Sequence, residues 1–185
     1  MNAINENFGV VTGPGTVRIE RTLPGPIERV WAYLTESDKR GSWLASGGMQ
    51  LHAGGRVDME FRNSELTEND DAPPQKYAQY AGPSQMQGRI IACDPPRLLE
   101  YTWGEADSDS QVRFELTPRG NDVQLVVIHS RLATRDDMTS VAAGWHTHLG
   151  ILADRLAGRT PPGFWATHTR VEAEYEKRFP REMSS

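Results

Sequence analysis

The chain has 185 residues, which is long enough for one globular domain with a substantial core. Its 25 acidic and 20 basic side chains give a net charge of -5, so a nucleic acid is not an expected partner. No apolar run approaches the roughly 20 residues that span a bilayer, and no signal segment opens the chain, so we expect a cytoplasmic protein with no membrane partner.

The first part of the chain predicts a strand followed by two short helices. Residues 1–15 are polar and rich in glycine and proline, which predicts a flexible leader. Apolar and charged side chains then alternate over residues 16–22, the pattern of a half-buried strand. Residues 23–34 place apolar side chains on one helical face, with Pro26 suited to a first turn. A second short helix is expected over residues 35–44.

The middle of the chain shows the two-residue alternation of strands. Residues 47–62 predict a hairpin that turns at Gly54 and Gly55. Residues 63–83 lose this alternation and collect acidic residues and prolines, which predicts a mobile loop. Further strands joined by tight turns are expected over residues 84–94, 97–103, 111–119 and 122–132. About six strands with hairpin connections indicate an antiparallel sheet, one face of which needs an apolar cover.

A long amphipathic helix over residues 136–158 is the expected cover. Asp136 and Asp137 suit the positive N-terminus of this helix, and Gly158 suits its end. Apolar side chains recur along it at spacings of three and four, which predicts one buried face formed by Met138, Val141, Trp145, Leu149, Leu152 and Leu156. The order of elements therefore predicts an α+β fold, in which the sheet packs against this helix.

Residues 159–185 follow the long helix as a C-terminal extension. Two prolines end the long helix, and Trp165, Val171 and Tyr175 can anchor a further short helical segment. We therefore divide the chain into a flexible leader over 1–15, a domain over 16–158 and this extension.

Four segments resemble the successive signature segments of one bacterial family. They are LTESDKRGSWLASGGMQLHAGGRV, GRIIACDPPRLLEYTW, VRFELTPRGNDVQLVVIHSRL and GWHTHLGILADRLAG. In this order they resemble the proteins named for homology to the activator of Hsp90 ATPase, in the START/Bet v 1-like (SRPBCC) superfamily. The resemblance covers residues 16–158 and implies a helix-grip fold. In that fold a curved antiparallel sheet wraps a long C-terminal helix, two short helices follow the first strand, and an elongated apolar cavity lies between sheet and helix.

Two histidines are candidate polar groups in such a cavity. His129 shares the inward side of the last strand with Leu125 and Val127, where it can orient a ligand or move a proton. His148 lies on or beside the apolar stripe of the long helix, one turn from Trp145, where it can anchor a ligand. For each residue the alternative is a structural histidine bonded to a nearby backbone group or loop.

Bulky side chains predicted to face inward form the rest of the candidate site. As cavity walls they would favour a flat or aromatic apolar ligand, whereas the alternative role is plain core filling. These residues are Trp43, Met59, Phe61, Tyr101, Trp103 and Trp145. The sequence contains no nucleophile elbow, phosphate-binding glycine loop, zinc-ligand spacing or paired acid motif. We therefore expect no catalytic motif, no metal and no cofactor.

Three functional hypotheses follow from these features. The leading hypothesis is a domain that binds a small apolar or amphipathic ligand between sheet and helix. The alternative is a protein partner, such as an Hsp90-type chaperone, bound through the acidic loop or the tail. A second alternative is an enzyme of the cyclase or hydratase kind that uses His129 as acid or base. A dimer is one assembly compatible with the sequence.

Overall fold

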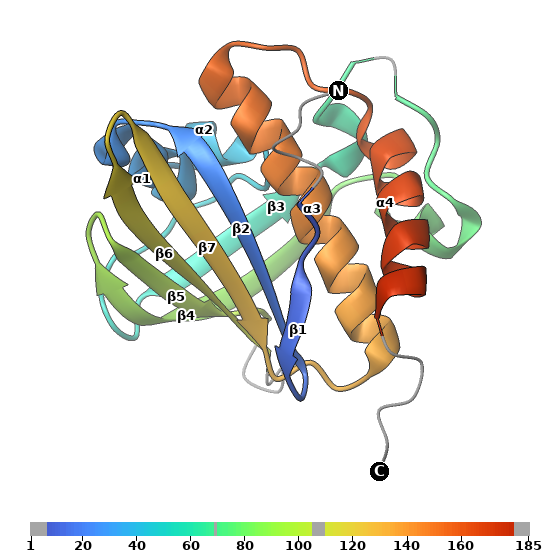
Figure 1. The fold of residues 1–185 in the computed structure, drawn as a ribbon, viewed down its shortest axis with the longest axis horizontal. Coiled ribbons are helices and arrows are strands. Elements are labelled where there is room, and N and C mark those ends of the chain that lie inside the picture. The colour runs from blue at the N-terminus through green and yellow to red at the C-terminus, as the bar shows by residue number, and fades with distance from the viewer. Residues whose placement is uncertain (1–6, 69, 105–109, 180–185) are drawn as a thin grey trace.

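The protein consists of one curved antiparallel sheet and two helices on its concave side (Figure 1). The computed structural model describes residues 7–68, 70–104 and 110–179. In these residues the sheet has seven strands in the order β1-β2-β7-β6-β5-β4-β3. The strands are β1 (Val10–Gly13), β2 (Thr16–Pro24), β3 (Arg56–Phe61), β4 (Ser84–Asp94), β5 (Leu98–Thr102), β6 (Gln111–Arg119) and β7 (Asp122–Ser130).

In the part of the chain that the structure describes, four helices accompany the sheet. They are α1 (Ile27–Thr35), α2 (Ser37–Gly41), α3 (Arg135–Ala157) and α4 (Phe164–Arg178), with short 3-10 turns η2 (Asn63–Glu65) and η3 (Gln75–Tyr80). The two short helices predicted after the first strand are therefore confirmed as α1 and α2, and the long helix as α3. Within the described ranges no helix has the length and apolar character needed to cross a membrane.

Alternation along β6 and β7 builds the concave face. Residues Val112, Phe114 and Leu116 of β6 are buried and pair in register with His129, Val127 and Leu125 of β7. Because successive side chains of a strand point to opposite faces, this register places all six on one side. Both strands were predicted from this pattern, and the structure confirms them.

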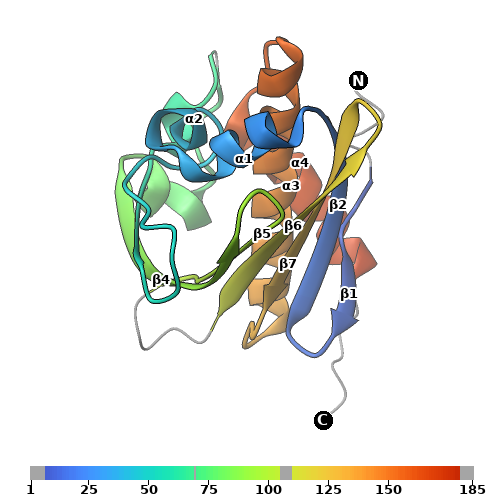
Figure 2. The same cartoon turned by 90° about the vertical axis from the view of Figure 1, so that its left-hand side faces the viewer.

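Helix α3 fills the concavity of the sheet (Figure 2). Thr134 and Asp137 form a reciprocal capping box at its N-terminus, and Gly158 ends it in the left-handed conformation with φ 72°. Leu149 and Leu152 are fully buried in the core cluster, at 0% exposure. The predicted helix-grip architecture is therefore confirmed.

Two predictions about the ends of the sheet need correction. Residues 10–13, expected within a flexible leader, form β1, which pairs with β2. The adjacent Gly9 amide also donates to the hydroxyl of Tyr175 in α4 at 2.7 Å. A contact from a helix far along the chain therefore helps to hold this N-terminal segment, whose own apolar alternation is weak. Residues 1–6 of the predicted leader lie outside the described ranges.

The predicted hairpin over 47–62 forms only its second strand. Before β3 the chain makes two isolated bridges, Ser46 to Glu60 and Met49 to Val57. The buried Arg40 guanidinium donates to the carbonyls of Gly47 and Asp58, at 2.6 and 3.2 Å. These hydrogen bonds engage carbonyls next to the bridges. Arg40 therefore holds residues 46–49 in place, and they do not form a continuous hydrogen-bonded strand pair with β3.

Candidate ligand-binding site

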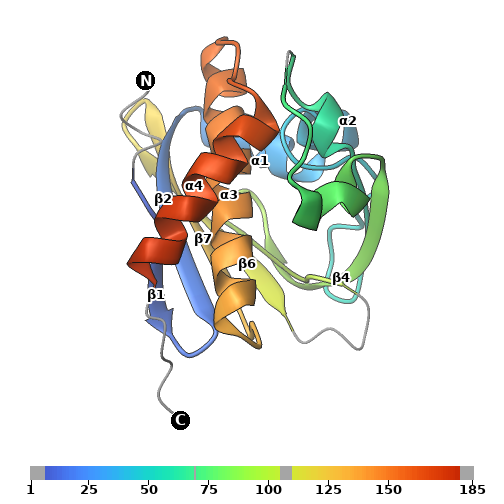
Figure 3. The same ribbon diagram turned by 90° about the vertical axis from the view of Figure 1, so that its right-hand side faces the viewer.

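A cavity of about 400 Å³ lies between the sheet, α3 and α4. Its inner wall comes from β3, β4 and β7, from the residue that follows β5, and from the first half of α3. Its outer wall comes from the segment with η2 and η3 and from α4. Figure 3 shows α4 crossing α3, with that segment beside them. We call these two surfaces the inner and the outer wall.

Five of the eight predicted site residues line this cavity. They are Phe61, Trp103, His129, Trp145 and His148. The other three, Trp43, Met59 and Tyr101, are at most 2% exposed and belong to the core behind it. Trp43 is fixed there because its indole N–H donates to the Tyr33 carbonyl at 2.7 Å. The structure therefore places these three residues in the core and not among the lining residues.

Aromatic rings form the apolar part of the inner wall. The ring centroids of Trp103 and Trp145 lie 5.2 Å apart, and those of Trp103 and Phe61 lie 5.8 Å apart. Phe114 supports Trp145 edge-on from the sheet at 5.5 Å. These separations are typical of favourable tilted and edge-to-face aromatic pairs, so the wall is a preformed surface.

His129 contributes the polar group of the inner wall. The Trp145 indole N–H donates to His129 Nδ1 at 3.0 Å. Because Nδ1 accepts this bond, the proton of the neutral ring is on Nε2. That Nε2 is buried and has no hydrogen-bond partner within the described residues. Burial also lowers the pKa of His129 to about 3, so the ring is neutral at physiological pH.

His148 is also neutral, with the opposite tautomer. Its Nδ1 lies 2.7 Å from the Trp43 carbonyl oxygen, which can only accept, so Nδ1 carries the proton. Burial lowers the pKa of His148 to about 4, against the opposing effect of that hydrogen bond. His148 thus combines the two roles that the sequence left open, because it is bonded to backbone and also lines the cavity.

The outer wall consists of residues that sequence reasoning missed. Tyr77, Tyr80 and Asn63 come from the segment predicted to be a mobile loop, and Phe164, Trp165 and His168 come from α4. Tyr77 stacks on Trp165 at 5.9 Å and meets His168 edge-on at 5.0 Å. The sequence hint of this wall was the pair of tyrosines inside a polar, acidic segment, because large aromatic side chains are unusual in a fully solvated loop.

The start of α4 is capped from the segment with η2 and η3. Gly163, at the N-cap position, has no side chain to offer. Instead the Asp70 carboxylate accepts from the amides of Trp165 and Ala166, and the Thr67 hydroxyl accepts from the Phe164 amide at 2.9 Å. Carboxylates suit the positive end of a helix, so this cap ties the two parts of the outer wall together.

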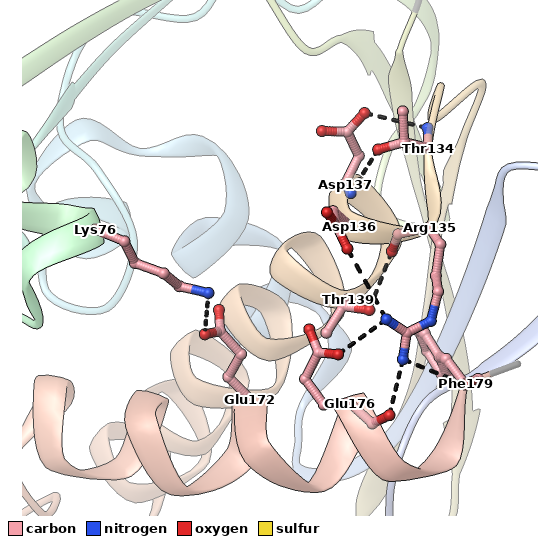
Figure 4. A network of polar contacts seen from close by, with 9 residues as sticks. All are labelled: Lys76, Thr134, Arg135, Asp136, Asp137, Thr139, Glu172, Glu176 and Phe179. Carbon is pink, nitrogen blue, oxygen red and sulfur yellow. Dashed lines mark hydrogen bonds and ion pairs between the residues drawn. The ribbon is translucent and has the colours of Figure 1, made fainter. Parts of the chain in front are cut away.

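Further along, α4 is fastened at two more places (Figure 4). Lys76 and Tyr77 both belong to η3. Lys76 forms an ion pair with Glu172 at 2.5 Å, and the Tyr77 hydroxyl donates to the same carboxylate. Near the other end, Arg135 of α3 donates to the Glu176 carboxylate at 2.9 Å and to its carbonyl oxygen at 2.7 Å. The predicted extension is thus a packed helix, and Trp165, Val171 and Tyr175 are buried in it as expected.

The described residues contain no group of three or more His, Cys, Asp or Glu side chains placed to hold a metal ion. The lining residues of the cavity offer aromatic packing together with hydrogen bonding by neutral side chains. This combination suits recognition of a small molecule with an apolar body and a few polar atoms.

Comparison with known proteins agrees with this architecture. The solution structure of the protein encoded by gene BPP1335 from Bordetella parapertussis is 42% identical, with a TM-score of 0.79, and the match covers 98% of this chain and 95% of that one. The crystal structure of CalU16 from Micromonospora echinospora is 19% identical, with a TM-score of 0.64, over 92% of this chain and 93% of that one. DynU16, from the dynemicin biosynthetic locus, is 22% identical, with a TM-score of 0.59, over 80% of this chain and 49% of that one.

The last two likenesses show the fold alone. No curated protein matched the sequence. The model of the family described as Activator of Hsp90 ATPase homolog 1-like protein matches residues 24–157, which span the chain from the end of β2 to the end of α3. The chain therefore belongs to the Activator of Hsp90 ATPase homolog 1-like protein family.

Proposed function

We propose that this protein binds a small apolar or amphipathic molecule in the cavity between the sheet, α3 and α4. The observation that carries the proposal is a volume of about 400 Å³ walled by aromatic side chains, which lies in the size range of small-molecule sites. Protein interiors are normally close-packed, so a cavity of this size beside a well-packed core needs an explanation. A bound ligand is the simplest one.

Gly144 supports the same proposal. It lies in the middle of α3 and lines the cavity. A Cβ added there would meet no atom within 4 Å outside its own helix and chain neighbours. Glycine inside a helix costs roughly 1 kcal/mol relative to alanine. The residue therefore lowers the stability of α3 while keeping the cavity open.

An enzyme of the cyclase kind is a second candidate, supported by the buried Nε2–H of His129. A neutral imidazole with a pKa of about 3 is a poor proton acceptor, so the acid or base role expected from the sequence has little support. The same N–H is suited to polarise a carbonyl oxygen of a bound substrate, because it is fixed in place by Trp145 and shielded from water.

A chaperone partner bound through the acidic segment is less well supported. Asp70, Thr67 and Tyr77 of that segment direct their side chains to α4, so they are engaged inside the protein. The chaperone hypothesis stays a prediction from sequence. A pull-down with an Hsp90-type chaperone tests it directly, and absence of binding rejects it.

The ligand proposal is tested by native mass spectrometry of the purified protein and by titration with an apolar fluorescent probe. The blocking variant is Gly144→Leu, whose side chain enters the cavity, and Gly144→Ala is the matched control. We expect the wild type to bind the probe, Gly144→Ala to bind somewhat less tightly, and Gly144→Leu to lose at least tenfold in affinity while keeping its melting temperature. Undiminished binding by a folded Gly144→Leu would contradict the proposal.

A further inference from the structure

Unpartnered polar atoms are concentrated in the walls of this cavity. His129 Nε2, His168 Nδ1 and Asn63 Oδ1 are each buried without a hydrogen-bond partner in the described part of the chain, and all three residues line the cavity. A buried polar group without a partner destabilises the folded protein, so native structures contain few of them. Three at one cavity indicate partners supplied by something bound there.

These atoms lie on two different walls. His129 is on the inner wall, where its ring contacts Trp103 at 5.6 Å. His168 is on α4, edge-on to Tyr77 at 5.0 Å. Asn63 precedes Ser64, whose hydroxyl accepts from the Trp165 indole N–H at 3.0 Å, so it also belongs to the outer wall. A molecule that satisfies all three atoms must therefore carry polar groups on opposite sides.

The hydrogen-bonding character of two of these atoms is defined. His129 Nε2 is a donor, because Nδ1 already accepts from Trp145. Asn63 Oδ1 is an acceptor. The ligand must offer an acceptor to the inner wall and a donor to the outer wall. A hydroxyl group can serve at either place, and a carbonyl can serve at the first.

The cavity has no charge to balance an ionic ligand. None of its described lining residues is Asp, Glu, Lys or Arg. Burial lowers the pKa of all three lining histidines, so they are neutral near pH 7. Lys76 and Glu172, which both contact the lining residue Tyr77, form an ion pair with each other at the rim. An unpaired carboxylate or phosphate would therefore be buried without compensation.

The shape of the walls limits the body of the ligand. Trp103, Trp145 and Phe61 present rings from the inner wall, and Trp165, Tyr77 and Phe164 present rings from the outer wall. Two facing aromatic surfaces favour a flat aromatic body, which can contact both walls by stacking or edge-to-face packing.

We propose that the ligand is an uncharged, flat aromatic molecule with a hydrogen-bonding oxygen at each end, one for His129 and one for Asn63 or His168. This inference rests on the proposed binding function and adds its chemical class. It excludes fatty acids and other anionic amphiphiles, which an apolar cavity alone would admit.

Four probes of one shape test it by chemical-shift titration of the full chain: naphthalene, 2-naphthol, 2,6-dihydroxynaphthalene and 2-naphthoate. We expect affinity to rise by about fivefold to tenfold with each hydroxyl, which is the size of one net hydrogen bond. We expect 2-naphthoate to bind more weakly than naphthalene. Equal affinities for naphthalene and the diol, or tightest binding by 2-naphthoate, would overturn the inference and leave the proposed function standing.

Two variants identify the groups responsible. His129→Asn keeps an acceptor for Trp145 and removes the Nε2–H, and Asn63→Ala removes the outer acceptor. Each variant should weaken binding of the diol by about fivefold to tenfold, the effect expected of one hydroxyl. The affinity for naphthalene should stay unchanged, and this unchanged affinity also shows that the variant is folded. If both variants bind the diol as the wild type does, the assigned recognition is wrong. If none of the four probes binds the wild type, the proposed function itself fails.

Discussion

The inner and outer walls of the cavity are held in different ways. The inner wall is part of the apolar core, in which α3 and the sheet bury residues such as Leu149 and Leu152. The outer wall also buries apolar side chains of α4 in that core, such as Phe164 and Val171. It depends in addition on polar contacts between segments far apart in the chain, such as the Asp70 cap on α4 and the ion pair between Lys76 and Glu172. Core packing is worth several kcal/mol per residue, whereas a cap or a surface pair is worth about 1 kcal/mol. Because the outer wall depends in part on contacts of this weaker kind, we expect it to open more readily than the inner one.

Removing a core side chain behind the inner wall should have the largest effect. Leu149 is fully buried, so Leu149→Ala should lower the free energy of unfolding by about 2 to 5 kcal/mol. The matched control is Leu51→Ala, because Leu51 is 41% exposed and should change stability by less than about 0.5 kcal/mol. Urea denaturation measures both. Similar losses of unfolding free energy in the two variants would show that the buried face of α3 does not contribute most of the core packing.

Acid should weaken the inner wall through its histidines. The pKa values of His129 and His148 are lowered to about 3 and about 4, below the unfolded value of 6.5. Between these values the unfolded chain binds more protons than the folded one, so stability is full above pH 6.5 and is lost as the pH falls. The expected contribution is on the order of 3 kcal/mol for each of the two histidines by pH 4.

Urea denaturation at several pH values measures this effect. His129→Asn should flatten the slope between pH 6.5 and 4, because the variant lacks one of the two groups. His52→Asn is the control, since His52 is exposed and its replacement should leave the slope as in the wild type. A wild-type slope that persists in His129→Asn would mean that other groups cause the acid sensitivity.

The outer wall should respond to loss of its cap. Asp70→Ala removes the acceptor for the first amides of α4, and we expect a loss of about 0.5 to 2 kcal/mol. Amide hydrogen exchange should show the loss mainly in α4, with the exchange of β6 and β7 unchanged. Asp71→Ala, at an exposed neighbour, should change neither. Uniform acceleration across the sheet would mean that the two walls unfold together.

The smallest effect is expected at the rim. Lys76 is 58% exposed where it pairs with Glu172, so Lys76→Gln should cost at most about 1 kcal/mol, and less at high salt. Thermal melting at low and high salt measures this dependence. Lys177→Gln provides the comparison, because Lys177 is 74% exposed and pairs with Glu174 of the same helix. Equal losses and equal salt dependence for the two variants would mean that the pair with Glu172 adds nothing beyond an ordinary surface pair.

The same contrast explains what could be predicted from the sequence. Strands β2 to β7 and α3 follow local apolar periodicity, so most of the fold and the inner wall could be predicted, including Trp103, Trp145 and His129. Trp43, Met59 and Tyr101 could not be separated from lining residues, because the same periodicity marks every inward side chain, whether it meets a cavity or the core. The outer wall was missed because its contacts are not local. Asp70 and Trp165 are 95 positions apart, and no sequence pattern in either segment predicts the hydrogen bond between them.

The distance between Asp70 and the start of α4 also orders events during protein synthesis. The strands of the sheet and α3 precede α4 in the chain, so they can leave the ribosome and begin to pack while the amides that Asp70 caps have yet to be made. Until then the aromatic inner wall has no cover from α4. The growing chain thus passes through a stage in which α4 does not yet cover the proposed ligand site.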